Sequence, residues 1–269
     1  MSLRPYAERV IPLSSSATSI DPGWSVAVAL VVLLAIALVA HRVADYELGW
    51  APLVAALRAL AQLTVVALLI KLVIEDLALS FGFVALMFVM AVLTTSRRTG
   101  ATGAWPWAAL AIACGVVPAI VTILATGAVP MEGIAIIPVA GIVIGNAMTA
   151  NTLLGRRAYP ALREEHHLYE GGLALGMAPH DAIREVIHRR APEALLPGLD
   201  QVTTTGVVTL PGAFIGVMLG GGTPVQAATA QALVLFGIMA AQTMTVAVGE
   251  RLVLARRLIP ADLRTTLID

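Results

Sequence analysis

Ala104-Trp-Pro-Trp-Ala-Ala-Leu-Ala-Ile-Ala-Cys-Gly-Val-Val-Pro-Ala-Ile-Val-Thr-Ile-Leu-Ala125 is an uncharged and almost entirely apolar stretch. About 20 apolar residues are what an α-helix needs to cross the ~30 Å hydrocarbon core of a bilayer. Because lipid cannot satisfy backbone N–H and C=O groups, a stretch of this kind must be helical. It therefore predicts a transmembrane helix.

The composition of the whole chain agrees with a membrane protein. Hydrophobic residues make up 58% of the sequence, charged residues 13%, and the mean hydropathy is +0.88. A soluble domain usually has about 25% charged residues. The formal net charge is zero, so nothing in it favours a nucleic-acid partner, and the single cysteine, Cys114, lies inside an apolar stretch. The composition predicts a chain whose main partner is the lipid bilayer.

Seven apolar stretches predict an all-α, polytopic integral membrane protein. The predicted spans are 24–40, 51–70, 80–93, 104–125, 134–154, 202–220 and 225–248. The predicted order is a polar leader (1–23), helices 1–5 (24–154), a soluble loop (155–200), helices 6–7 (201–248) and a C-terminal tail (249–269).

The distribution of basic residues predicts the orientation. With the N-terminus outside, fourteen of the 17 basic residues fall on the inner side and three on the outer side. The inner set is Arg42, Arg58, Arg97, Arg98, Arg156, Arg157, Arg163, Arg184, Arg189, Arg190, Arg251, Arg256, Arg257 and Arg264, and the outer set is Arg4, Arg9 and Lys71. Inner loops carry an excess of Lys and Arg. We therefore expect a multi-pass protein of the plasma (inner) membrane, N-out and C-in.

The loop 155–200 contains Glu170-Gly-Gly-Leu-Ala-Leu-Gly176. Its spacing resembles that of the cytoplasmic coupling loop of ABC-transporter permeases, which binds an ATPase. Gly176 predicts a helix end, because a residue without Cβ accepts left-handed backbone angles, and Pro179 predicts a new helix start. The alternative is an amphipathic helix pair with no partner.

The helix expected after Pro179 carries an apolar stripe, which we expect to enter a groove on the ATPase. The stripe is Ala182, Ile183, Val186 and Ile187, and the other candidate coupling residues are Glu170, Gly171, Gly172, Gly176 and Pro179.

The energy source is predicted to lie on another subunit. The only lysine, Lys71, is followed by Leu72, whereas a phosphate-binding loop needs Gly-Lys-Ser/Thr. All 17 acidic residues lie outside the predicted spans, although ion-coupled carriers usually place titratable groups inside them. We therefore expect no enzymatic activity and no cofactor on this chain, with ATP and magnesium bound by a separate ATPase subunit.

Small residues recur at helical spacing in two spans. Gly141 and Gly145 form a GxxxG motif, and Gly212, Gly216 and Gly220 form a longer stripe. Such stripes allow helix backbones to approach closely in lipid. They predict packing inside one bundle or, alternatively, the contact of a permease homodimer.

Polar residues gather in the last three spans. They are Asn146, Thr149, Asn151, Thr203, Thr204, Thr205, Gln231, Gln242, Thr243 and Thr245, with Met148, Met218, Met239 and Met244 in the same region. They either bond helices to one another or line a path, for which the candidates are Asn146, Met148, Thr149, Asn151, Thr204, Thr205 and Gln231. Methionine sulfur suits copper(I) but also packs adaptably, so no metal site is assigned.

Several longer motifs resemble those of one known family. They are Ile137-Pro-Val-Ala-Gly-Ile-Val-Ile-Gly-Asn-Ala-Met148, Leu175-Gly-Met-Ala-Pro179, Leu196-Pro-Gly-Leu-Asp200, Gly206-Val-Val-Thr-Leu-Pro-Gly212 and Gly222-Thr-Pro-Val-Gln-Ala-Ala228. They are similar to the FetB-type ABC permeases, which include plant aluminium-tolerance permeases. The resemblance implies a permease subunit that pairs with a FetA-type ATPase and exports iron or a related metal complex. Hard iron prefers carboxylate or histidine ligands, which the spans do not offer. A permease for another small solute and a non-transporting scaffold therefore remain alternatives.

Overall fold

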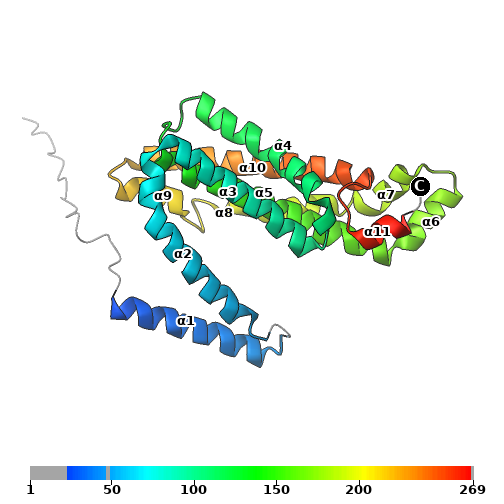
Figure 1. Cartoon of the computed structure of the whole chain (residues 1–269), viewed down its shortest axis with the longest axis horizontal. Coiled ribbons are helices and arrows are strands. Elements are labelled where there is room, and N and C mark those ends of the chain that lie inside the picture. The colour runs from blue at the N-terminus through cyan, green and yellow to red at the C-terminus, as the bar shows by residue number, and fades with distance from the viewer. Residues whose placement is uncertain (1–22, 47–48, 268–269) are drawn as a thin grey trace, which may run out of the picture. The chain divides into compact units, whose positions relative to one another are not determined.

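The structure, a computed structural model, describes residues 23–46 and 49–267. Its helices are α1 (Trp24–Val43), α2 (Ala51–Glu75), α3 (Leu77–Thr99), α4 (Trp105–Ala125), α5 (Gly133–Glu164), α6 (His166–Ala174), α7 (Pro179–Ile187), α8 (Leu196–Thr204), α9 (Gly212–Leu219), α10 (Pro224–Leu254) and α11 (Ala261–Thr266) (Figure 1). Two 3-10 turns are η1 (Thr102–Ala104) and η2 (Ala191–Leu195). Within the described residues, the only strand-like pairing is an isolated bridge between Thr205 and Thr209. The all-α prediction is confirmed.

Six helices in the described part of the chain are long and apolar enough to cross a membrane. They are Trp24–Val43, Ala51–Glu75, Leu77–Thr99, Thr102–Ala125, Gly133–Glu164 and Pro224–Leu254. Each of the six contains one of the predicted spans and extends beyond it at one or both ends. The chain is a polytopic helical membrane protein. The predicted leader, residues 1–23, lies almost wholly outside the described residues.

The predicted sixth span, 202–220, is wrong as a single helix. It is divided between α8 and α9 by a turn in which the Gly206 N–H donates to the Thr209 carbonyl at 2.8 Å. Gly206 has a φ of +90°, which favours glycine. Pro211 then precedes α9 and lacks an N–H to continue a helix. The run of β-branched residues before this turn also lowers helix propensity.

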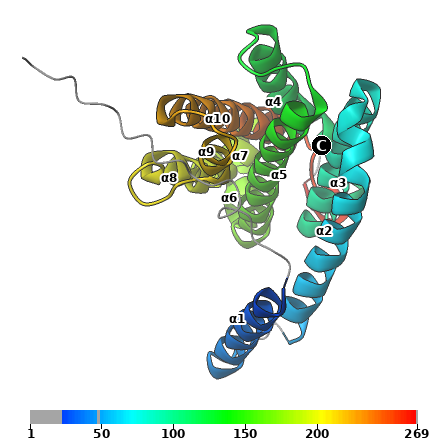
Figure 2. The ribbon, with the colours of Figure 1, turned by 90° about the vertical axis from the view of Figure 1, so that its left-hand side faces the viewer.

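The chain divides into two compact units, residues 1–69 and 70–269. The first unit contains α1, which buries none of its residues within the chain. The second unit contains a bundle in which α10 packs along α4 and α5, and α3 packs along α5 (Figure 2). This bundle positions the candidate site.

Two of the bundle helices begin at side-chain caps. The Asp76 carboxylate accepts hydrogen bonds from the backbone N–H groups of Ala78 and Leu79 at the start of α3. At the start of α10, the Thr223 hydroxyl and the Gln226 side chain form a reciprocal capping box. Each cap satisfies N–H groups that have no partner inside the helix.

Helices α4 and α10 approach very closely at Gly115. A Cβ at this position would overlap the Ala241 carbonyl oxygen and Thr245 Oγ1 of α10. Further along, a Cβ at Gly237 would lie 3.0 Å from the Ile123 side chain. Because higher numbers on α10 pair with lower numbers on α4, the two helices are antiparallel. Small residues are what allow this approach in lipid.

Helices α5 and α10, in contrast, run in the same direction. Gln242 contacts Asn146, and Gly249 lies against Leu154, so both numbers rise together. The chain must therefore return from the end of α5 to the start of α10. The segment containing α8 and α9 makes this return, so a broken element occupies the place of the predicted sixth span.

Helix α5 extends well beyond its apolar part. Its 32 residues correspond to about 48 Å at 1.5 Å per residue, compared with the ~30 Å of hydrocarbon. The extension carries α6, α7 and the C-terminal residues at one end of the bundle (Figure 1). We call this the arginine-rich end, after Arg156, Arg157, Arg163, Arg184, Arg189 and Arg190.

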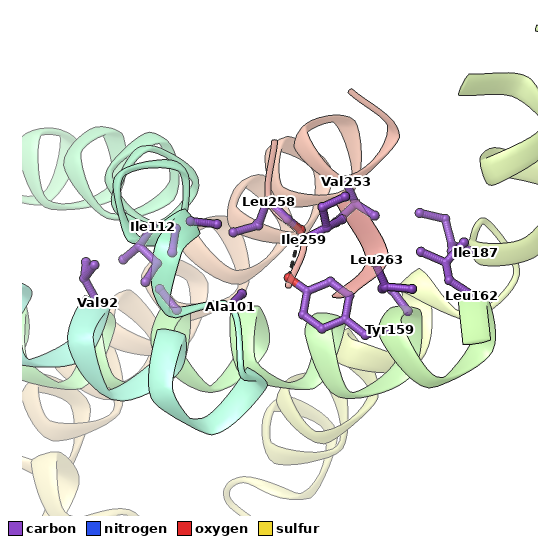
Figure 3. Close-up of a cluster of buried hydrophobic side chains, with 14 of the residues drawn as sticks. Val92, Ala101, Ile112, Tyr159, Leu162, Ile187, Val253, Leu258, Ile259 and Leu263 are labelled. Carbon is purple, nitrogen blue, oxygen red and sulfur yellow. Dashed lines mark hydrogen bonds between the residues drawn. The ribbon is translucent and has the colours of Figure 1, made fainter. Parts of the chain in front are cut away.

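The C-terminal segment packs on this extension instead of leaving it. Leu258, Ile259 and Leu263 are buried, and the Tyr159 hydroxyl donates a 2.9 Å hydrogen bond to the Leu258 carbonyl (Figure 3). Arg163 donates to the Asp262 carboxylate at 2.8 Å. This bond holds the pKa of Asp262 below its usual range. Much of the segment predicted as a C-terminal tail is therefore folded against the extension of α5.

The close approach at Gly115 can be tested with one added methyl group. We expect Gly115→Ala to lower the free energy of unfolding by about 1–3 kcal/mol, because the methyl group would force α4 away from α10. Gly82→Ala in α3 is the matched control, since a Cβ there meets nothing within 4 Å. Thermal unfolding of both variants in the same detergent is the measurement. Equal melting temperatures would contradict the packing described.

Candidate functional site

The predicted coupling loop has the expected path but a different orientation of its apolar face. Helix α5 leads into α6, Gly176 has a φ of +85°, and Pro179 is in the first turn of α7. The helix–reversal–helix prediction is confirmed. Because Gly176 adopts left-handed angles, the chain reverses there without steric strain.

The apolar stripe of α7 is buried within the chain itself. Ala182, Ile183, Val186 and Ile187 are at most 3% exposed and belong to the same core as Leu162, Tyr169, Leu263 and Leu267. Figure 3 shows Ile187 beside Leu162 at this end of the bundle. The expectation that this stripe enters an ATPase groove is therefore wrong for these side chains. The periodicity did indicate a buried face, and the chain's own α5 and α6 cover it.

Close packing of α6 on α7 depends on Gly172. A Cβ there would lie 3.1 Å from the Ala182 Cβ and 3.2 Å from the Met177 sulfur, whereas a Cβ at Gly171 meets nothing within 4 Å. Glu170 is exposed on α6, and its carboxylate lies 3.5 Å from the imidazole of His166 one turn earlier. The two glycines therefore have different roles although they are neighbours in sequence.

The opposite side of α7 and the reversal before it face outward. A shallow cavity of about 470 Å³ is lined there by Met177, Asp181, Arg184, Glu185, His188 and Arg189. Leu175, at the reversal, is 86% exposed. We call Leu175 and these six lining residues the elbow surface. It combines two apolar side chains with a charged rim. Leu175 and Met177 lie in a motif quoted for the family resemblance but were not among the candidate coupling residues.

Polar side-chain contacts hold the segment that follows α7 against the rest of the bundle. His188 Nδ1 lies 2.8 Å from the Glu250 carboxylate of α10, and Arg190 pairs with Glu165 at the start of α6. Arg157 of α5 lies 3.2 Å from Glu193 of η2. The elbow surface is thus connected to α10 through His188.

A second, larger cavity lies among α5, α9 and α10. Its volume is about 880 Å³, and it reaches from the α4–α5 loop to Gln201 of α8. Most of the lining is apolar, and the polar side chains are the amides of Asn146, Gln201 and Gln231. Gly145, Gly212 and Gly216 also line it, and a Cβ at any of them meets nothing within 4 Å. We call this the amide cavity.

The glycine stripes therefore do not have one common role. Gly141 lines the amide cavity but also faces α3, where a Cβ would lie 2.6 Å from the Met87 methyl carbon. Gly220, directly after α9, lies near the Gly216 carbonyl. The remaining three widen the amide cavity.

Only two of the predicted path residues, Asn146 and Gln231, line the amide cavity. Asn151 bonds instead to Thr95 of α3, at 3.1 Å. Thr149, Thr204 and Thr205 donate to backbone carbonyls one turn earlier in their own helices. Met148 packs against the core, and Met218, Met239 and Met244 do not line this cavity. Gln201 was not predicted, because a glutamine beside a turn has no distinguishing pattern.

Among the described residues, no group of three or more His, Cys, Asp or Glu side chains converges to form a metal-binding cluster.

Comparison with known proteins identifies the family. Residues 24–258 match the family described as "Uncharacterised protein family (UPF0014)". The chain belongs to the UPF0014 family. Among the family's members, UPF0014 membrane protein STAR2 of Oryza sativa subsp. japonica is 29% identical over 191 residues, which cover 70% of this chain and 67% of that protein.

Two further relatives of this UPF0014 chain carry more descriptive names. Protein ALUMINUM SENSITIVE 3 of Arabidopsis thaliana is 34% identical over 109 residues, 40% of each chain. The Escherichia coli (strain K12) protein named "Probable iron export permease protein FetB" is 26% identical over 227 residues, 82% of this chain and 86% of that one. No solved structure matches the chain.

The burial of α7 predicts that its stripe stabilises the fold. We expect Ile183→Ala to lower the free energy of unfolding by about 2–5 kcal/mol, since it leaves a cavity in a packed core. Its neighbour Arg184 is exposed, so Arg184→Ala should change stability by less than about 0.5 kcal/mol. The measurement is thermal unfolding in detergent. If Ile183→Ala were as stable as Arg184→Ala, the stripe would not be packed in the protein.

Proposed function

We propose that this chain is the membrane-spanning permease subunit of an ABC transporter in the plasma (inner) membrane. In this proposal two copies pair, each binds a FetA-type ATPase subunit, and the complex exports iron or a related metal complex. ATP and magnesium are bound by the ATPase. The observation that carries the proposal is the elbow surface at the arginine-rich end of the bundle.

The elbow surface has the chemistry of a docking site. Leu175 projects from the reversal with most of its surface in contact with solvent, and Met177 lies beside it, 37% exposed. Interfaces commonly have such an apolar centre inside a charged rim. The rim here is Asp181, Arg184, Glu185, His188 and Arg189. The proposal replaces the buried stripe of α7 with this outward face as the ATPase contact.

The cargo is suggested by the relatives and by the amide cavity. One relative that covers most of this chain is named an iron export permease, and a shorter match is named for aluminium sensitivity. The lining of the amide cavity is apolar with neutral amides, a surface that suits a metal complex better than a hydrated cation. The second candidate cargo is another small solute. A panel of solutes tested for stimulation of ATP hydrolysis would distinguish such a solute from a metal complex.

The proposal requires the arginine-rich end to be cytoplasmic. A tag inserted beside Arg189, or a reporter fused after Asp269, should report the cytoplasm, because positively charged loops are retained inside. A tag inserted beside Glu132, in the α4–α5 loop, should be accessible from outside. Labelling of intact cells with a membrane-impermeant reagent is the measurement. Finding Glu132 and Arg189 on the same side would exclude both the orientation and the return path through α8 and α9.

The docking surface can be tested with charge changes that leave the core intact. We expect Leu175→Asp and Arg184→Glu each to weaken ATPase binding at least about tenfold, equivalent to 1.4 kcal/mol, without altering thermal stability. Arg98→Glu is the matched control, because Arg98 is also an exposed arginine and lies in the last turn of α3, outside the elbow surface. The chain is co-expressed with a FetA-type ATPase, and the mass of the purified complex should correspond to two of each subunit. Full ATPase association in both elbow variants would exclude this surface, and purification without any ATPase would favour a scaffold.

A further inference from the structure

Another cavity, between the start of α4 and the C-terminal segment, has a lining whose only charged side chains among the described residues are arginines. Its volume is about 570 Å³, and it is lined by Trp107, Ala255, Arg256, Arg257, Arg264, Thr265 and Leu267. We call it the arginine cavity. Because every charged group in this lining is a guanidinium, the cavity attracts anions and repels cations.

Two of the lining arginines have no carboxylate partner in the described part of the chain. Arg257 and Arg264 form no ion pair there, and the acidic side chain of α11, Asp262, is bound to Arg163 at 2.8 Å. Arg264 Nη2 donates to the Arg257 carbonyl at 3.2 Å, which brings the two residues together. Since each guanidinium has five N–H donors, this bond leaves most of them for a ligand.

The segment that carries these arginines is fixed in the fold. Leu258, Ile259 and Leu263 are buried in the core (Figure 3). The Arg257 guanidinium lies 4.6 Å from the centroid of the Trp107 ring, a cation–π contact that holds it beside the first turn of α4. Side chains that are already held in place lose little conformational freedom when a ligand binds.

Arg256 occupies a backbone position that is typical of glycine. It follows Ala255, the last cap of α10, and its φ is +56°. The Arg256 N–H donates to the Val253 carbonyl and the Arg257 N–H to the Leu252 carbonyl, each at 2.8 Å, which is the glycine-type helix ending. A residue with a Cβ is strained in this conformation. Strained residues are concentrated at functional sites, so this position agrees with a role for the side chain.

The arginine cavity lies where two membrane-crossing helices end. Helix α4 has 21 residues, which correspond to ~31 Å at 1.5 Å per residue, close to the ~30 Å of hydrocarbon. Its first turn, with Trp107, therefore lies at the boundary between hydrocarbon and headgroups, a depth at which tryptophan is enriched. Helix α10 runs in the opposite direction and ends at Leu254, directly before the lining residue Ala255. The cavity is thus at the depth of the phospholipid phosphates.

An exposed apolar face of α4 continues from the cavity toward the centre of the membrane. Leu110, Val117 and Val121 are exposed and follow Trp107 at helical spacing, so they lie on the same side of the helix. An acyl chain attached to a headgroup in the arginine cavity can lie along this face. A soluble phosphate compound has no part that would cover it, so the surface favours a lipid.

We propose that the arginine cavity binds the phosphate group of an anionic phospholipid, with N–H groups of Arg257 and Arg264 donating to the phosphate oxygens. The choline cation of phosphatidylcholine would face the guanidinium groups, so a headgroup without a cation, such as the glycerol of phosphatidylglycerol, is preferred. Basic pockets between membrane-spanning helices bind anionic headgroups in this way. The site needs neither an ATPase nor a cargo, so it stands or fails separately from the proposed transporter.

Competition between two lipids measures the preference. The purified full chain in detergent receives equal amounts of phosphatidylglycerol and phosphatidylcholine with the same acyl chains, and native mass spectrometry counts each lipid bound per chain. We expect one phosphatidylglycerol to bind about fivefold more tightly than phosphatidylcholine, equivalent to ~1 kcal/mol. Phosphatidylglycerol should also raise the melting temperature, because a ligand that binds only the folded chain stabilises it.

Substitutions of single arginines test the site against general attraction to a charged surface. Arg257→Gln and Arg264→Gln should each weaken phosphatidylglycerol about fivefold and leave phosphatidylcholine unchanged. Arg257→Lys should also weaken it, because lysine keeps the charge but loses the planar contact with Trp107. Arg98→Gln is the matched control, since Arg98 is an exposed arginine in the last turn of α3, outside the cavity. Melting temperatures without added lipid should match that of the parent chain and so exclude misfolding.

Several results would overturn the site. Equal binding of the two lipids by the parent chain is one. An equal loss in Arg98→Gln and in the cavity variants, or full preference in Arg257→Lys, would indicate only a general attraction to positive charge. Displacement of phosphatidylglycerol by millimolar inorganic phosphate or glycerol phosphate would assign the cavity to a soluble phosphate compound. Preference that emerged only in Asp269→Asn would mean that the chain's own carboxylate takes the place of the lipid.

Discussion

Backbone hydrogen bonding is the constraint on which this structure depends, because a bilayer offers no water to satisfy N–H and C=O groups. Six long helices meet this requirement within themselves. The exception is the break between α8 and α9, where the Gly206 N–H donates to the Thr209 carbonyl and the Val208 N–H to the Thr204 carbonyl. Irregular backbone is tolerated at membrane depth where it is buried in protein or lines a cavity. Pro211 and Gly212, directly after the break, line the amide cavity.

Close packing of small residues determines how these helices are arranged. There is little hydrophobic force between helices in lipid, so van der Waals contact must hold them together. At Gly115 this contact brings α4 against the backbone of α10, and Gly155 brings α5 against Thr99 of α3. Helices α5 and α10 consequently run in the same direction, which obliges the chain to return through α8 and α9. The amide cavity forms where this returning segment fills less space than a full helix would.

The two candidate sites are connected through α10. The elbow surface is joined to this helix by His188 and Glu250, and the amide cavity by Gln242, which contacts both Asn146 and α8. Helix α7 does not offer its apolar stripe to a partner, because α5 and α6 already bury it. What remains for a partner is the reversal at Leu175 and the charged side of α7. A contact made there would act on the C-terminal ends of α5 and α10, whereas the N-terminal halves of the same two helices line the amide cavity.

The sequence by itself determined the membrane class, the positions of the six long helices, and the reversal at Gly176. These features depend on local properties, namely hydropathy over a helix length and the tolerance of glycine for left-handed angles. Asn146 and Gln231 were also predicted as path residues, and they do line one cavity. Local patterns could not decide which partner covers an apolar face, so the stripe at Ile183 was assigned outward although the chain's own residues cover it. Nor could they show that 202–220 is broken, because mean hydropathy averages over the turn at Gly206. The tertiary structure decided both points, since burial and the space left by glycines depend on helices that are distant in sequence but adjacent in the bundle.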